Sequence, residues 1–160
     1  MKLTTKGRFA VTALLDMILA ANANNLDNPQ NIATPISLLN ISKRQDISLS
    51  YLEQLFVKLR KSGIVKSYKG PGGGYIIAKN PNEITISNVI NAVNDDMDAR
   101  NCHGMVNCKN NKQKCLTHDL WSGLTEHIYN YLDNISLYDL LLQNTQSLYQ
   151  STPVKIIKFA

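Results

Sequence analysis

The sequence predicts a mainly α-helical protein with a small β wing: a winged helix-turn-helix domain joined to a long dimerisation helix. Between residues 36 and 63, a short helical pattern, a tight turn and a longer helical pattern follow one another. Two strand-like stretches joined by GPGGG come next. A second long helical pattern covers residues 116–132. Helix, turn, helix and hairpin, in this order, are typical of a winged helix-turn-helix.

Length and charge indicate two parts. A chain of 160 residues accommodates one domain, or a small domain with an appended helical element. Residues 1–79 carry 11 Lys and Arg against 4 Asp and Glu, whereas residues 80–160 carry 6 against 8. A basic first half favours a module that binds a polyanion such as DNA, and a solvated basic face without a partner is the alternative. We expect a DNA-binding domain at 1–80, a cysteine-containing loop with dimerisation helices at 81–145, and a C-terminal tail at 146–160.

The N-terminus imitates a signal peptide, with a basic start, an apolar run and an Ala-Asn-Ala end at residues 21–23. Asp16 interrupts the apolar run, which a signal peptide rarely tolerates. We therefore expect an amphipathic core helix at 6–21 of a cytoplasmic protein. Its apolar face is predicted to contain Val11, Leu14, Leu15 and Ile18. No run approaches the roughly 18 apolar residues that a membrane span needs, so no membrane partner is expected.

The helix-turn-helix is predicted to follow a loop. Residues 22–35 are rich in Asn and contain two prolines, which indicates a surface loop. The next short helix, at 36–45, is expected to direct Ile36, Leu39 and Ile41 inward. A tight turn follows at 45–47, where Asp46 tolerates the left-handed conformation.

The clearest helix in the chain covers residues 48–63. Its apolar residues fall within an arc about 120° wide, and Gly63 ends the helix. These apolar residues are Leu49, Leu52, Leu55, Phe56 and Leu59. In a major groove, the side chains near the start of such a helix reach base edges: Ser48, Ser50, Tyr51, Glu53 and Gln54. Cations further along the helix are suited to phosphates: Lys58, Arg60 and Lys61.

Two alternatives compete with this interpretation of the helix. Glu53 could close a capping box with Ser50 and so be unavailable to a base. The helix could also be an ordinary core helix with a charged outer face.

The hairpin that follows is expected to have strands at 64–69 and 75–79. Pro71 suits the first turn position, and the glycines supply positive φ. Because the tip has few side chains, its backbone amides can approach a phosphate or a narrow groove, and Lys69 adds charge. A nucleotide-binding loop is the alternative, but the stretch lacks the Lys-Ser/Thr of a P-loop and opens no helix.

The second half is predicted to be helical. Residues 84–93 form a short helix capped by Thr85 or Ser87. Ser136 and Asp139 form a capping box that opens a last helix, with apolar residues Leu137, Leu140 and Leu141. The stripe of the 116–132 helix contains Leu116, Leu120, Leu124, Ile128 and Leu132. A stripe this long favours pairing with a second copy, and packing back on its own domain is the alternative.

Residues 102–118 contain every cysteine of the chain. Cys102, Cys108 and Cys115, together with His118, can supply four metal ligands, and Cys115 and His118 share a helix face. Spacing alone leaves structural zinc and an iron–sulfur cluster open. An odd cysteine count disfavours a disulfide. No partner base for a catalytic cysteine is visible, so we expect no enzyme.

Four stretches resemble the IscR family of winged-helix iron–sulfur regulators: TTKGRFAVTALLDM, ISLSYLEQLFVKLRKSGIV, KGPGGGYIIAK and CLTHDLW. The resemblance extends from Met1 to about Leu141 and implies a dimeric bacterial transcription factor. It implies a 2Fe–2S cluster held by the three cysteines and His118. It implies that Ser50, Tyr51 and Glu53 read bases. It also implies backbone contacts from Thr5, Lys6 and Arg8, and minor-groove contacts from a wing containing Lys69, Gly70, Gly72 and Gly73.

The chain departs from the family pattern in three places. The 22–35 loop is longer than usual, Lys69 stands where an Arg is expected, and one extra residue separates Cys108 from Cys115. Lys does not replace the guanidinium fork, so a minor-groove contact would be weaker. The expected function is control of iron–sulfur cluster assembly genes. The alternatives are a zinc-stabilised DNA-binding regulator without sensing and a nitric oxide-sensing repressor like NsrR. A thiol enzyme or electron carrier would have no use for a basic winged helix.

Overall fold

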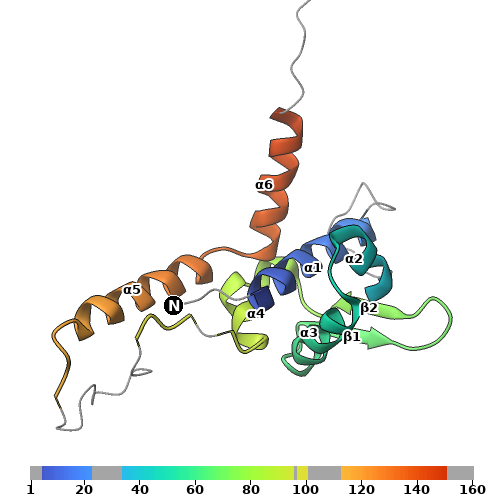
Figure 1. Ribbon diagram of the computed structural model, residues 1–160. Helices are drawn as coiled ribbons and strands as arrows, with labels where there is room; N and C mark the ends of the chain where they lie inside the picture. The colour runs from blue at the N-terminus through green and yellow to red at the C-terminus, as the bar shows by residue number, and fades with distance from the viewer. Residues whose placement is uncertain (1–4, 23–33, 96, 101–112, 151–160) are drawn as a thin grey trace, which may run out of the picture.

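The computed structural model describes residues 5–22, 34–95, 97–100 and 113–150. The elements, in order, are α1 (Thr5–Asn22), α2 (Leu38–Gln45), α3 (Leu49–Lys61), β1 (Val65–Tyr68), β2 (Gly74–Ile77), η1 (Pro81–Glu83), α4 (Ile86–Ala92), α5 (His118–Asp133) and α6 (Leu137–Gln150). Helices α1 to α4 and the hairpin gather in one body, from which α5 and α6 extend in different directions (Figure 1). The predicted fold class, mainly α with a small β wing, is confirmed. No helix in the described ranges is long and apolar enough to span a membrane.

Helix α1 is the centre of the core and contacts α2, α3, α4 and α6. The predicted helix is confirmed, but its buried surface is wider than a stripe. Leu14 and Ile18 are fully buried, as are Ala10, Ala13 and Met17. Val11 and Leu15 are only partly buried. The small alanines let neighbouring helices approach α1 on several sides.

Helix α2 begins one turn of backbone later than the sequence suggested. Ser37 is the N-cap and accepts a hydrogen bond from the Asn40 N–H, while Ile36 forms a β-bridge with Tyr75. Starting from this cap, the helix directs Leu38 and Ile41 inward, and Leu39 is 49% exposed. The prediction that Leu39 faces the core is therefore wrong, because the cap fixes the rotation of the helix. The predicted loop at 22–35 lies largely outside the described residues.

The turn and helix α3 agree with prediction. Asp46 has a left-handed backbone, with φ 52°, and ends α2. Leu52, Leu55, Phe56 and Leu59 are buried, and Leu49 is partly buried. The ring of Phe56 packs edge-on against Tyr75, with ring centroids 4.9 Å apart. Gly63, with φ 71°, follows the end of α3. The recognition helix is therefore attached to the core through one face, and its opposite face is left to solvent.

The wing is a two-stranded antiparallel sheet in which Val65 pairs with Ile77 and Tyr68 with Gly74. At its tip, the Gly73 N–H donates to the Gly70 carbonyl at 2.9 Å. Gly72, after Pro71, has φ 76°, as the third residue of a type II turn requires. A Cβ on Gly74 would overlap the Ile36 backbone, so a glycine there allows the bridge that fastens the wing to the start of α2.

Caps organise the second half. Thr85, not Ser87, is the N-cap of α4 and forms a capping box with Asn88; Ser87 is buried one turn inside. The Ser136–Asp139 capping box is confirmed: Asp139 accepts from the Ser136 N–H at 2.8 Å. Leu137 and Leu141 are buried and Leu140 partly so. Helix α6 continues to Gln150, and the division into parts at 80 and 145 stays a prediction.

Candidate DNA interface and cysteine segment

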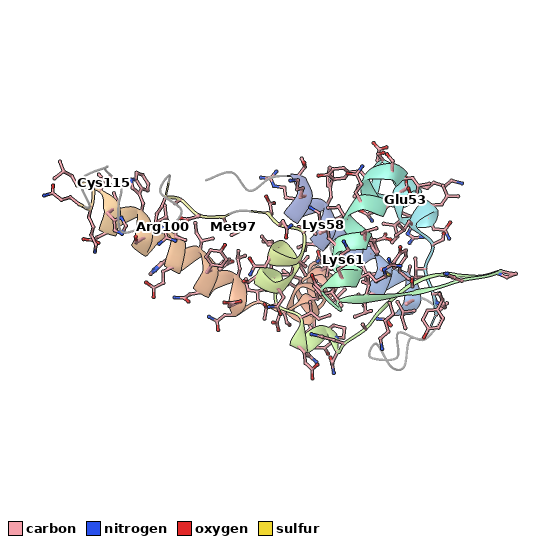
Figure 2. All side chains as sticks on the ribbon, turned by 90° about the horizontal axis from the view of Figure 1, so that it is seen from below. Glu53, Lys58, Lys61, Met97, Arg100 and Cys115 are labelled. Carbon is pink, nitrogen blue, oxygen red and sulfur yellow. The ribbon has the colours of Figure 1, made fainter. Side chains whose placement is uncertain are left out.

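The outer face of α3 presents the polar side chains that the sequence predicted for base contacts. Ser48 is the N-cap, and its hydroxyl lies 3.0 Å from that of Ser50. Ser50 is thus already inside the helix, and the alternative capping box between Ser50 and Glu53 is not formed. Glu53 and Gln54 are exposed, and Glu53 has no partner within the described residues. Figure 2 shows Glu53 on the outer side of the helix. Its carboxylate is available to a ligand.

Tyr51 lies at the flank of α3 rather than at the centre of its outer face. Its ring packs edge-on against Phe9, with centroids 5.8 Å apart, and its hydroxyl lies 3.4 Å from Thr5 Oγ1. Lys6 and Arg8 are exposed on the same first turns of α1. This brings the predicted N-terminal contacts beside the recognition helix. A hydroxyl pair at the edge of a helix suits a phosphate, which lies at the rim of the groove.

The three predicted phosphate-contacting cations of α3 differ in their surroundings. Arg60 and Lys61 are exposed, whereas Lys58 is half-buried. The Lys58 ammonium donates to the Val93 carbonyl at 3.0 Å, and Val93 is the C-cap of α4. A cation at a helix C-terminus is stabilised by the helix dipole. Lys58 therefore joins α3 to α4, a role that its place in the sequence did not indicate.

A second contact missed by the sequence fixes α2 against α1. Asp16 is only 7% exposed and accepts from Arg44 Nη2 at 2.7 Å and from Gln45 Nε2 at 2.7 Å. The hydrogen bond from Arg44 to Asp16 raises the pKa of the guanidinium. The signal was present, because an acidic residue inside an apolar helix needs a buried partner. This clamp sets the angle of the helix-turn-helix on the core, and hence where α3 points.

The wing residues are accessible. Lys69, Gly70 and Gly72 are exposed, and Gly73 is partly so. A Cβ on Gly73 would overlap the carbonyl oxygens of Tyr68 and Gly70, so the tip closes tightly only without a side chain there. A narrow tip with exposed amides and one lysine has the shape that a minor-groove contact requires.

The cysteine segment is described only at its end. Cys102 and Cys108 lie outside the described residues, so the four-ligand set stays a prediction. Cys115 is partly exposed and forms no disulfide. His118 is the first residue of α5 and only 9% exposed, and its N–H donates to the Cys115 carbonyl at 3.1 Å. The predicted proximity of these two residues in one turn is confirmed. Within the described ranges alone, no three potential ligands cluster.

The segment from Val93 to Arg100 connects the DNA-binding body to the start of the cysteine segment. The Gly7 N–H donates to Asp95 Oδ2 at 2.9 Å, and Met97 is buried. The Ala99 N–H donates to Thr125 Oγ1 on α5 at 3.0 Å. Figure 2 shows Met97 and Arg100 between Lys58 and Cys115. The backbone leading to Cys102 is thus attached to α1 and α5, and its first residue is held by Lys58.

A salt bridge stiffens the end of that segment. Arg100 Nε lies 2.8 Å from Asp98 Oδ1, and the Thr125 hydroxyl also donates to Asp98. The hydrogen bonds from Arg100 are the main reason why the pKa of Asp98 is lowered to about 2.

Comparison with known proteins decides what kind of molecule carries this face. The family model Rrf2, described as an iron-dependent transcriptional regulator, matches residues 3–143. The chain belongs to the Rrf2 family. This Rrf2 regulator is 50% identical over 144 residues to the HTH-type transcriptional regulator IscR of Aliivibrio salmonicida, covering 90% of this chain and 79% of that protein. It is 47% identical over 141 residues to IscR of Escherichia coli, covering 88% and 80%.

Solved structures agree. T. potens IscR matches with a TM-score of 0.69 and 30% identity over 92% of this chain and 90% of that chain. CymR, the global cysteine regulator of B. subtilis, matches with a TM-score of 0.69 and 26% identity over 89% and 98%. The resemblance to IscR and the winged-helix fold are confirmed. This Rrf2 protein is a DNA-binding transcription regulator and not an enzyme.

Proposed function

We propose that this Rrf2 regulator senses an iron–sulfur cluster, of the 2Fe–2S type, and controls iron–sulfur cluster assembly genes in the bacterial cytoplasm. The proposed ligands are Cys102, Cys108, Cys115 and His118. The observation that carries the proposal is the Cys115–His118 turn at the start of α5, in a chain that is about half identical to IscR proteins over most of its length.

The described donors suit such a group. Cys115 is accessible and unlinked, and it immediately precedes the N-terminus of the 16-residue helix α5. The positive end of a helix dipole favours a thiolate over a thiol, and favours an anionic cluster near it. A cluster bound here would supply a group whose charge and presence depend on redox state and iron supply. The protein's part is to hold this group against the first turn of α5.

Single substitutions test the ligand set. Changing each cysteine to Ala should abolish the visible absorption of anaerobically prepared protein, because a thiolate has no local substitute. His118→Cys should retain a cluster and bind it more tightly. His127→Ala is the matched control, since His127 is exposed on the same helix and should leave the spectrum unchanged. Folding, followed by circular dichroism, should survive each change.

Loss of folding in the cluster-free variants would instead indicate a structural site of the zinc type. A cluster that reacts with nitric oxide in preference to oxygen, without response to iron supply, would favour the NsrR-like alternative.

We also propose that the protein acts as a two-fold dimer paired through α5. Leu120, Leu124 and Tyr131 lie within an arc of about 40° on α5, and all three are exposed, at 63%, 37% and 68%. Figure 1 shows that this helix extends away from the body. Burying a large apolar side chain contributes about 1.5–3 kcal/mol, so a second copy covering this stripe would be well stabilised. A two-fold dimer would present two recognition helices to a palindromic operator.

Oligomeric state tests this pairing. Leu124→Glu should shift the protein from dimer to monomer in sedimentation equilibrium. Val57→Glu is the control, because Val57 is also an exposed apolar residue, 40% accessible, but lies on the outer face of α3. It should leave the dimer intact and weaken DNA binding. A wild-type monomer at micromolar concentration would contradict the proposal.

A further inference from the structure

An open groove lies between the end of α3 and the wing. It has a volume of about 500 Å³ and is lined by Arg60, Gly63, Val65, Lys66, Ser67, Tyr68 and Ala78. One wall comes from the last turn of α3 and the other from strand β1. The hairpin projects beside α3 (Figure 1), so the groove separates the recognition helix from the wing.

The charged and hydroxyl side chains of this groove are suited to an anion. Its ionisable cations are Arg60 and Lys66, and Ser67 and Tyr68 add hydroxyls. The Arg60 guanidinium reaches across from α3 to within 3.5 Å of Ser67 Oγ. Lys66 is exposed and has no partner within the described residues. No carboxylate lines the groove. A site with only positive and neutral donors favours phosphate over a metal ion or a neutral ligand.

The surrounding sequence reinforces this charge. Residues 54–82 contain six Lys and Arg and no Asp or Glu. A neighbouring depression on the other side of the sheet has a different character, because Glu83 lines it together with Lys79, Asn88 and Asn91. The acid-free groove is therefore the one whose electrostatic potential would attract a polyanion.

The geometry of duplex DNA assigns an occupant to the groove. The recognition helix lies in the major groove, and the wing is directed at the adjacent minor groove. Major and minor grooves are separated by a sugar–phosphate strand, so this strand must pass between α3 and the wing. We propose that the groove holds a phosphate of that strand, bound by Lys66 and Arg60 with help from the Ser67 and Tyr68 hydroxyls. This inference rests on the proposed placement of α3 and the wing on DNA.

Salt dependence of DNA binding tests the assignment. The probe is a duplex recovered from random DNA by selection with the wild-type protein, and affinity is measured by fluorescence anisotropy over a series of KCl concentrations. Lys66→Ala should lower the log–log salt slope by about 0.9 per chain, the value for one lost phosphate contact. Lys66→Arg should restore it. Lys79→Ala is the control, since Lys79 is an exposed lysine next to β2 that lies outside this groove, and it should leave the slope unchanged.

A neutral phosphate locates the contact. Single methylphosphonate linkages are placed in turn along each strand. One linkage, on the strand between the major and minor grooves, should weaken wild-type binding but leave the Lys66→Ala variant unaffected. A slope equal to that of wild type, equal effects of Lys66→Ala and Lys79→Ala, or no linkage that removes the difference would each overturn the proposal.

Two further outcomes separate the sources of failure. Tight binding of inorganic phosphate without DNA would overturn the assignment to the DNA backbone. Failure of the wild-type protein to recover any duplex would instead refute the placement on DNA itself.

Discussion

Replacing Glu53 by Ala should change which DNA sequence is preferred and leave protein stability almost unchanged. Glu53 is exposed, has no partner within the described residues and does not take part in a cap, because the N-cap of α3 is Ser48. Surface changes of this kind alter the free energy of unfolding by less than about 0.5 kcal/mol. A carboxylate that accepts from cytosine contributes about 1–3 kcal/mol of discrimination, which corresponds to roughly a 5- to 150-fold change in relative affinity at one base pair.

The assay is competition anisotropy with duplexes that differ by one base pair, combined with urea unfolding. Removal of an acid also raises non-specific DNA affinity, so Glu126→Ala serves as the control: Glu126 is exposed on α5, and its loss changes the net charge equally. Glu53→Ala should flatten the preference at one position of each half-site, and Glu126→Ala should not. Unchanged preference together with a clear loss of stability would refute the assignment of Glu53 to base recognition.

Three further changes test the contacts that orient the recognition helix. Asp16→Asn should lower the free energy of unfolding by about 1–3 kcal/mol, since it weakens a buried charged acceptor, whereas Asp119→Asn, whose exposed pair with Lys114 contributes little, should cost less than about 0.5 kcal/mol; equal costs in urea unfolding would count against the clamp. Lys58→Met should destabilise the protein more than Lys61→Met, because Lys58 alone of the two bonds the end of α4, and equal unfolding curves would show that the bond contributes nothing. Hydrogen bonds from Ser136 lower the pKa of Asp139, so its stabilisation is present above the ordinary aspartate pKa and is lost as the pH falls through the lower folded-state value; the stability difference between wild type and Asp139→Asn should therefore shrink in acid, and a difference independent of pH would contradict this.

Features set by local rules could be predicted from the sequence. Asp46 adopts the left-handed backbone that its turn needs. Pro71 and Gly72 form the expected turn, and the Ser136–Asp139 box opens α6. Each depends on a few neighbouring residues, so one sequence contains the information. The apolar stripe of α3 was equally legible, because its spacing alone determines one face.

Features set by contacts between distant residues could not be predicted. Leu39 faces solvent because the cap at Ser37 and the bridge between Ile36 and Tyr75 fix the rotation of α2. Lys58 meets Val93, which lies 35 residues away. The ring of Tyr51 lies against Phe9, from another helix. Such partners depend on how the helices pack, which periodicity does not specify.

The cysteine segment illustrates a different limit. Three cysteines and one histidine at this spacing are compatible with zinc or with an iron–sulfur cluster, because both take thiolate and imidazole ligands. The sequence reveals the ligands' chemistry, while the choice of metal is favoured by the likeness to IscR proteins. Only the metal content of the protein separates the two.

The most direct test of the proposed sensing function is therefore a metal and sulfide assay on protein made and purified without oxygen. Iron, acid-labile sulfide and zinc are quantified per chain, alongside the visible spectrum. The cluster proposal predicts iron and sulfide in equal amounts, approaching two of each per chain, with little zinc and a spectrum that disappears in Cys115→Ala. Stoichiometric zinc with no iron or sulfide would contradict it and would make this Rrf2 protein a zinc-stabilised regulator.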